Sequence, residues 1–307
     1  MAQLSVIIPT YKRPAILKRT LEHLAKQTIA SELEVIVVHD GEDDEETVSI
    51  FSNTTHYSLP TTHYFKIPKS HQGVARNFGL QHATAPLTLF IGDDIFLAPD
   101  ACEVHLAAHA ASGERVASSD QRGILTAHRS SLIAVLGFTT WDPSLTITPA
   151  MRWLEETGWQ FGYTMLLPYR HDFIPPDLQH RFTYTSHISL PTDVARAHPF
   201  REDRDLYGWE DTLWGTILRD SGVKLFYEPD ATALHYHQLD LNDSLARIEV
   251  MGKSLLHLTK VEPRMRERMP SGWKLWAYRI LACLPTMRGR HYKAFLRGLS
   301  ESNKEGI

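Results

Sequence analysis

Short apolar runs alternate with segments of helical periodicity over residues 1–112. The runs predict four strands, at 4–8, 34–38, 63–67 and 87–91. The segments between and after them predict helices that begin near Pro14, after 42–46, at Gly73 and at Ala101. Because alternating strands and helices form parallel sheets with right-handed crossovers, the pattern predicts an α/β fold. The uninterrupted apolar run of the second strand further predicts helices on both faces of the sheet.

Polar side chains gather just beyond the ends of the predicted strands. Tyr11, Asp40, Asp93 and Asp94 each follow closely on an apolar run. In parallel α/β sheets, ligands bind beyond the carboxyl ends of the strands. The pattern therefore predicts a ligand site that contains these four side chains.

The pair Asp93-Asp94 suggests a metal site. Two carboxylates at a strand end can hold Mg²⁺ or Mn²⁺, which prefer hard oxygen ligands. An acidic pair is also common in turns and helix caps, and the triplet Gly92-Asp93-Asp94 alone does not separate the two interpretations.

The second half of the chain offers a base and further ligands. Glu210 and Asp211 precede a predicted helix at 212–219, where one carboxylate could remove a proton from a hydroxyl group. Acidic residues also stabilise the first turn of a helix without any catalytic role. His235 and His237 occupy alternate positions of an extended segment, so both imidazoles could face one ion, or either could be structural.

Two other residues could recognise a nucleotide. Asp40 could accept a hydrogen bond from the N3–H of uracil, or it could form an ordinary turn with Gly41. Arg76 could pair with a diphosphate, or it could be a solvated arginine on a helix face. The glycine spacing around Gly73 matches neither a dinucleotide-binding fingerprint nor a Walker loop.

Charge is distributed unevenly along the chain. Residues 253–307 carry 12 Lys and Arg against 4 Asp and Glu, whereas residues 1–252 carry 20 against 32. An acidic body of this kind argues against nucleic acid as a partner.

The remaining composition predicts a cytoplasmic protein. Cys102 and Cys283 form neither a disulfide framework nor a metal-spaced pair. The first residues lack a basic signal-peptide region, and no apolar stretch is long enough to span a bilayer.

The basic C-terminal part has two interpretations. Residues 264–297 interleave arginine and lysine with Trp273, Trp276 and aliphatic residues. Such a helical segment could lie on an anionic membrane surface, at the inner face of the membrane, and a lipid-linked acceptor would then be plausible. Alternatively, it packs against the acidic body with Trp273 and Trp276 as core anchors.

Taken in order, these segments resemble family 2 glycosyltransferases of the GT-A fold. The matching segments are Val6–Tyr11, Val37–Gly41, Gly73–Asn77 and Phe90–Asp94, and Tyr207–Asp211 with His235 resembles the acceptor half of galactosyltransferase-like and chondroitin-polymerase-like members. The resemblance implies a Rossmann-like nucleotide-binding sheet with helices on both faces and a helical C-terminal extension. It implies a nucleotide-sugar-binding half at 1–112, an acceptor-binding and catalytic half at 113–252, and the basic extension at 253–307.

The resemblance also implies an activity and a role for each matching residue. A sugar would pass from a nucleotide-sugar, expected to be a UDP-sugar, to a saccharide or lipid-linked acceptor by a metal-assisted inverting displacement. Asp211 would be the base and Glu210 would orient the acceptor. The metal, Mn²⁺ or Mg²⁺, would be held by Asp94, His235 and His237. The donor nucleotide would be bound by Pro9, Thr10, Tyr11, Arg13, Asp40, Arg76 and Asp93.

Three positions depart from the family pattern. Gly92 stands where many members have Asp, His39 where Asp is frequent, and His187 where Asn is usual. Because of Gly92, one alternative is that the protein is a relative that binds nucleotide-sugars without catalysing transfer. A sugar nucleotidyltransferase is the other alternative, although the loop at 9–14 lacks the glycines that such an enzyme needs.

Overall fold

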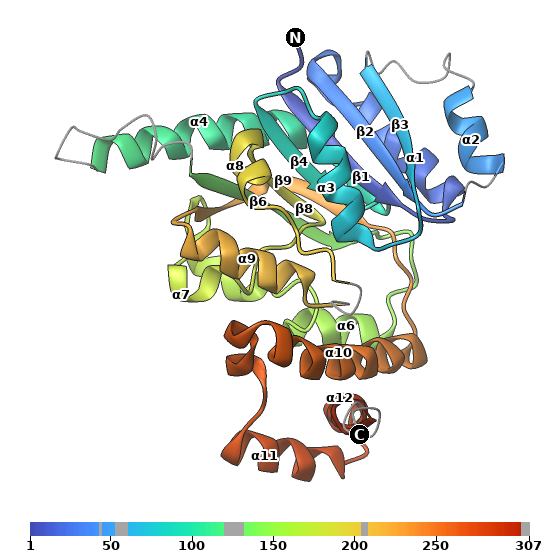
Figure 1. Ribbon diagram of the computed structural model, residues 1–307, viewed down its shortest axis with the longest axis vertical. Helices are drawn as coiled ribbons and strands as arrows, with labels where there is room; N and C mark the ends of the chain where they lie inside the picture. Colours follow the sequence, from blue (N-terminus) through green and yellow to red (C-terminus); the bar gives the residue numbers. More distant parts are fainter. Residues whose placement is uncertain (43–44, 53–60, 120–131, 204–207, 302–307) are drawn as a thin grey trace.

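A mixed sheet forms the centre of the molecule, and helices cover both of its faces (Figure 1). The computed structural model describes residues 1–42, 45–52, 61–119, 132–203 and 208–301. The strands are β1 (Leu4–Thr10), β2 (Leu33–Asp40), β3 (Thr61–Ile67), β4 (Leu87–Ile91), β5 (Ile95–Leu97), β6 (Ile133–Trp141), β7 (Asp172–Phe173), β8 (His187–Pro191) and β9 (Lys224–His235). Their order is β3-β2-β1-β4-β8-β6-β9-β5, and β7 pairs with β9.

Helices connect these strands and continue beyond the last one. The α-helices are α1 (Pro14–Ala25), α2 (Glu45–Ser52), α3 (Gln72–His82), α4 (Ala101–Ser119), α6 (Pro149–Thr157), α7 (Pro176–Gln179), α8 (Thr192–Ala197), α9 (Glu210–Asp220), α10 (Leu241–Val261), α11 (Gly272–Ala282) and α12 (Met287–Glu301). Short 3₁₀ segments are η1 (Ala30–Glu32), η2 (Tyr163–Tyr169) and η3 (Pro263–Arg268).

The four strands predicted in the first half are confirmed, and β4 has the predicted bounds. Strands β1 to β4 run parallel to one another, as the alternation of strands and helices predicted for the first half of the chain. The second half adds strands of the opposite direction. β8 runs antiparallel to both β4 and β6, and β5 runs antiparallel to β9. An apolar run shows that a strand is buried, whereas strand direction depends on connections that local periodicity does not encode.

Alternate residues of the strands face two separate cores, as the apolar runs predicted. Val6 and Ile8 pack with Leu21 of α1 on one face of the sheet. Ile7, between them, belongs to the core on the opposite face, which includes Trp214 of α9. This alternation places helices on both faces and confirms the α/β class.

The C-terminal helices form a layer at one end of the molecule (Figure 1). α10 and α12 pack closely because Gly252 and Gly298 leave room for the facing backbone. α11 packs on α12 through Tyr278, whose ring stacks on Tyr292 at a centroid distance of 4.2 Å. The helical character of this region is thus confirmed. The expected boundary near residue 253, between the catalytic half and the C-terminal extension, falls inside α10.

Trp273 and Trp276 do not anchor α11 in a core. Their side chains are 75% and 67% exposed, so the expectation that they bury themselves against the acidic body is wrong. Tyr278, on the other side of the helix, makes the packing contact instead. Within the described ranges, no helix has both the length and the apolar character needed to cross a bilayer.

Candidate active site

The predicted site residues that end or follow strands lie at one edge of the sheet. β1, β2, β3 and β4 are parallel and end there, and β6 and β9 run in the same direction. β8 is antiparallel, so its first residue, His187, pairs with Ile91 at the end of β4. This edge carries Thr10, Asp40, Asp93, Asp94 and His235 at or just after strand ends.

Asp94, His235 and His237 form a compact group of potential metal ligands. Asp94 Oδ2 lies 3.2 Å from His237 Nδ1 and 3.5 Å from His235 Nε2. One ligand atom from each residue lies within 4.8 Å of the other two. The pairing of Ile95 in β5 with His235 in β9 brings the histidines to the aspartate.

The ionisation of this group suits a divalent cation. Burial lowers the pKa of His235 and keeps its imidazole in the neutral form that binds metals. Although burial opposes ionisation of Asp94, hydrogen bonds from His235 and His237 hold the pKa of its carboxyl well below its usual range. The donors therefore fit a bound cation, with one carboxylate and two imidazoles facing one another.

Arg13 spans both aspartates. Its Nη1 donates to Asp94 Oδ2 at 2.8 Å, and its Nη2 pairs with Asp93. Thr10 Oγ1 also donates to Asp93 Oδ2, at 2.8 Å. Burial, together with the neighbouring Asp94 charge, raises the pKa of Asp93 to about 7. Asp93 thus binds Thr10 and Arg13, whereas Asp94 faces the histidines.

Gly92 gives the Asp94 carboxylate its position. A side chain at residue 92 would place its Cβ 2.8 Å from Asp94 Oδ1. The departure of Gly92 from the family pattern therefore leaves space that Asp94 occupies, and the cluster retains a carboxylate directed at the histidines.

Asp40 lies in a second polar group at the same edge. Its carboxylate accepts hydrogen bonds from Lys69 Nζ at 2.9 Å and from the backbone N–H and hydroxyl of Ser70 at 2.6 and 2.9 Å. Lys69 Nζ also lies 3.7 Å from the centroid of the Tyr11 ring, which is 38% exposed. Asp40 and the aromatic face of Tyr11 are thus joined through one lysine. Pro9, by contrast, pairs with Val38 inside the sheet.

Arg76 is buried, so the alternative of a solvated arginine is wrong. Its side chain is on α3 and is 3% exposed. Nε and Nη1 have no hydrogen-bond partner among the described residues. Burial lowers the pKa of the guanidinium, against the opposing effect of the Asp211 and Glu210 charges. A buried cation therefore faces the two carboxylates predicted to act on the acceptor.

Glu210 and Asp211 are the first two residues of α9. Asp211 accepts hydrogen bonds from the hydroxyl and the backbone N–H of Thr185, at 2.5 and 3.3 Å. Glu210 is buried and accepts a long hydrogen bond from Gln72 Nε2 at 3.4 Å. Burial and the Asp211 charge raise the pKa of Glu210. Asp211 is thus the better oriented carboxylate, held by two donors from one residue.

The motif around these carboxylates is tied to the C-terminal helices. The indole N–H of Trp209 donates to the carbonyl oxygen of Met251 in α10 at 2.9 Å. Gly208 has a φ of +80° and lies against the Met251 side chain. Tyr207, the first residue of the matching segment, lies outside the described residues.

Lys69, Gln72 and Thr185 also belong to the site, although sequence reasoning did not select them. Lys69 follows the end of β3, so the strand-end rule that selected Asp40 would also have selected it. Thr185 precedes β8 and reaches the same edge only because β8 is antiparallel. His187 is buried and faces Thr139 and His105, within the interior.

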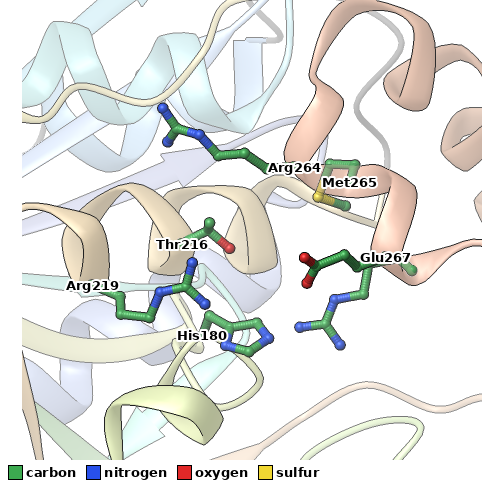
Figure 2. Close-up of a pocket in the computed structure, with 7 residues that line it drawn as sticks. His180, Thr216, Arg219, Arg264, Met265 and Glu267 are labelled. Atoms are coloured by element: carbon green, nitrogen blue, oxygen red, sulfur yellow. The ribbon is translucent and has the colours of Figure 1, made fainter.

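A pocket separate from this edge lies between α9 and η3 (Figure 2). It is lined by His180, Thr216, Arg219, Arg264, Met265, Glu267 and Arg268. The predicted site residues take no part in its lining, and its α9 residues come from the helix end opposite Glu210 and Asp211.

Comparison with known proteins supports the assignment of the first half of the chain. Residues 5–136 match the sequence model of glycosyl transferase family 2. A validoxylamine A glucosyltransferase of Streptomyces hygroscopicus subsp. limoneus is 39% identical over 109 residues, which cover 35% of this chain and 24% of the relative. An uncharacterised glycosyltransferase of Haemophilus influenzae is 35% identical over 102 residues, 33% of this chain and 32% of the relative. The matches thus span about a quarter to a third of these relatives.

Solved structures share the whole fold at low sequence identity. The mannosyltransferase PcManGT from Pyrobaculum calidifontis has a TM-score of 0.61 and 13% identity, covering 99% of this chain and 88% of its own. TarS from S. aureus (residues 1–349, with UDP) has a TM-score of 0.51 and 15% identity, covering 99% and 92%. These likenesses show a GT-A-like fold. Together with the match over 5–136, they support a family 2 glycosyltransferase.

Proposed function

We propose that this chain transfers a sugar from a UDP-sugar to a hydroxyl group of a saccharide or lipid-linked acceptor, with inversion at the anomeric carbon. One observation carries the proposal. A single sheet edge joins the Asp94–His235–His237 group to the strand-end carboxylates, while Arg76 faces a positioned carboxylate, Asp211. The family match supports a transferase, and the fold neighbours were solved with UDP, with UDP-GlcNAc, or with GDP-Man and Mn²⁺.

Asp94, His235 and His237 would hold the divalent cation. Their mixed oxygen and nitrogen donors suit Mn²⁺ better than Mg²⁺, which favours oxygen ligands almost exclusively. When bound, the cation would neutralise the diphosphate leaving group. Arg76 contributes a second positive charge, which Glu210 and Asp211 offset in part, so an anionic diphosphate complements it.

Asp40 and Tyr11 would bind the nucleobase. The exposed ring of Tyr11 offers a flat apolar surface against which a base can stack. The Asp40 carboxylate is held in place by Lys69 and Ser70. Oδ1 accepts both hydrogen bonds from Ser70, whereas Oδ2 accepts from Lys69 and keeps a second lone pair for the N3–H of uracil. A buried carboxylate at this position favours a base with an N–H donor.

Asp211 would act as the general base. Its carboxylate takes the proton from the acceptor hydroxyl as that oxygen forms a bond to the anomeric carbon. The bond from the same carbon to the diphosphate oxygen breaks, and the nucleoside diphosphate leaves with the electron pair. Thr185 fixes the orientation of Asp211, and Glu210 lies beside it to position the acceptor. A single displacement of this kind inverts the configuration.

A donor screen tests the proposal. We expect release of UDP from one or more UDP-sugars in the presence of Mn²⁺ and a saccharide acceptor, with loss of release in excess EDTA. Proton NMR of the product should show the anomeric configuration opposite to that of the donor. Release of pyrophosphate from a sugar phosphate and a nucleoside triphosphate would instead identify a nucleotidyltransferase. Donor binding without turnover would identify a catalytically silent relative.

The base is tested by the Asp211→Asn variant. We expect kcat to fall by about 10²- to 10⁴-fold, the usual contribution of a positioned general base, while donor affinity changes little. Asp193→Asn is the matched control, because Asp193 is an exposed acid in the first turn of α8. Equal kcat values for the two variants would exclude Asp211 as the base.

A further inference from the structure

Helix α11 presents an exposed apolar stripe to solvent. Trp273, Trp276, Ile280 and, just past the helix, Leu284 are 75%, 67%, 46% and 46% exposed. Their spacing of three, four and four residues places them on one side of the helix. Two neighbouring exposed tryptophans with two exposed aliphatic residues are unusual on a surface that faces only water.

The packing of α11 fixes the direction of this stripe. Tyr278 stacks on Tyr292 of α12 and also contacts the ring of Phe295, at a centroid distance of 6.4 Å. α12 in turn is held against α10, where Gly298 lies on the backbone of Glu249. α11 therefore cannot roll to bury the tryptophans without losing these contacts. It forms the end of the molecule farthest from the N-terminus (Figure 1).

The surroundings of the stripe are basic. Residues 268–300 contain seven Lys and Arg and no Asp or Glu. On α11, Lys274 and Arg279 are exposed and lie on opposite flanks of the stripe at helical spacing. Within the described ranges, neither of them forms an ion pair with a carboxylate, unlike Arg297, which pairs with Glu249. The face thus combines apolar side chains with uncompensated positive charge.

We propose that this face of α11 binds the surface of an anionic lipid bilayer. Tryptophan favours the interface between headgroups and acyl chains, and the aliphatic residues can enter the acyl boundary beside it. Lys274 and Arg279, on the two flanks of the stripe, would lie against the lipid headgroups. The proposed contact is with the surface of the bilayer, at the level of the headgroups.

The charge pattern selects lipid over a second copy of the chain. Two copies that met through this face would use the same surface twice, as two-fold contacts do. Each would bring Lys274 and Arg279 toward the other, and residues 268–300 contain no carboxylate to offset them. The two segments would repel each other, whereas anionic headgroups supply the missing negative charge.

The proposal also gives the membrane contact a connection to the candidate active site. α12 packs on α10, and α10 holds Trp209, the residue before Glu210, through the carbonyl oxygen of Met251. A chain anchored by α11 would therefore keep its catalytic helix at a set distance from the bilayer. The inference of lipid binding does not depend on glycosyl transfer, because it rests on α11 alone.

Vesicle sedimentation of the full chain tests the proposal. We expect co-sedimentation with vesicles of 70% phosphatidylcholine and 30% phosphatidylglycerol, and at least about tenfold weaker binding to pure phosphatidylcholine. The Trp273→Ser/Trp276→Ser variant should lose about tenfold or more in affinity for the anionic vesicles. Lys274→Glu/Arg279→Glu should lose at least as much. All four side chains are exposed, so the thermal unfolding midpoints should stay at the wild-type value.

Two matched controls separate this face from the rest of the surface. Leu167→Ser removes an exposed apolar side chain from η2, and Lys18→Glu/Lys26→Glu reverses two exposed charges, one on α1 and one directly after it. Both should bind anionic vesicles like the wild type. Three results would overturn the proposal. The wild type could fail to bind anionic vesicles, or the α11 variants could bind them as well as the wild type does. Light scattering could instead show a dimer that the Trp273→Ser/Trp276→Ser variant does not form. Donor turnover in vesicle-free buffer, measured separately, reports only on the proposed enzymatic function.

Discussion

The backbone N–H of Tyr236 donates a hydrogen bond to the carbonyl oxygen of Asp94, at 2.8 Å. This bond extends the pairing of Ile95 with His235. It places His235 and His237, the residues before and after Tyr236, with their imidazoles close to the Asp94 carboxylate. The ligand group is thus positioned by backbone pairing between β5 and β9. A side-chain substitution in it should therefore change binding without changing the fold.

Replacing Asp94 with Asn should weaken metal binding while the protein stays folded. The amide keeps the shape of the side chain but removes the anionic donor, so we expect the Kd for Mn²⁺ with UDP present to rise by about tenfold or more. Electron paramagnetic resonance of free Mn²⁺ measures it. Asp230→Asn removes an exposed carboxylate from a different group, formed by His171, Glu228 and Asp230, and this control should bind Mn²⁺ normally. Wild-type affinity in Asp94→Asn would exclude Asp94 as a ligand.

Arg76→Met should weaken donor binding without destabilising the protein. A buried guanidinium with unpartnered nitrogens carries a desolvation cost, and an apolar residue of similar length removes it. We expect the free energy of unfolding in urea to stay within about 1 kcal/mol of wild type or to rise. Affinity for the nucleotide-sugar should fall, as measured by calorimetry.

Arg196→Met provides the contrast for Arg76. Arg196 donates to the carbonyl oxygens of Leu80 and Ala83, so its loss should lower the free energy of unfolding by about 1–3 kcal/mol. If Arg76→Met were destabilised as much as Arg196→Met, Arg76 would be a structural residue.

Gly298→Ala should loosen the C-terminal layer. An added Cβ at this position of α12 would overlap the backbone of Glu249 and Lys253 in α10, so the two helices would have to separate. We expect the free energy of unfolding to fall by about 1–3 kcal/mol, as for overpacked cores. Ser300→Ala, at an exposed position of the same helix, should leave the unfolding midpoint in urea near that of the wild type.

Buried histidines should make the protein labile in mild acid. His187 and His105 are fully buried, and each has a ring nitrogen without a partner among the described residues. Burial lowers the pKa of His187 to about 4 and holds that of His105, which also faces His187 and His109, well below its usual range. The unfolded chain protonates near pH 6.5, so it takes up protons that the folded state does not.

Stability should therefore decline as the pH falls from about 6.5 toward 4, and be unaffected by these groups above that window. Within that window, each histidine should lower the free energy of unfolding by about 1.4 kcal/mol per pH unit. Urea unfolding at pH 7.5, 6.0 and 5.0 measures the slope. His187→Asn should reduce the slope by about one histidine's share, whatever its effect on stability at pH 7.5. An unchanged slope would show that His187 titrates alike in both states.

Local sequence determined the strands and part of the site. The apolar run at 87–91 coincides with β4, and the carboxylates that follow it lie at the predicted sheet edge. Asp40 follows β2 in the same way. These features could be predicted because strand burial and strand ends depend on neighbouring residues, and parallel strands bring their carboxyl ends together.

Tertiary structure alone decided which of these residues meet. Asp94 and His235 are far apart in the chain, yet Asp94 Oδ2 lies 3.5 Å from His235 Nε2 because β5 pairs with β9. β5 is too short to be recognised in the sequence as an apolar run. Thr185 reaches Asp211 because β8 is antiparallel. Local periodicity contains neither strand direction nor long-range register, so it could not predict either contact.

Burial on the helices was decided in the same way. Arg76 and Trp276 each lie on a helix whose sequence allowed either a buried or an exposed side chain. The fold buries the arginine opposite Glu210 and Asp211, and it leaves the tryptophan in solvent because Tyr278 takes the contact with α12. The neighbours that a helix meets select its buried face, and those neighbours come from distant parts of the chain.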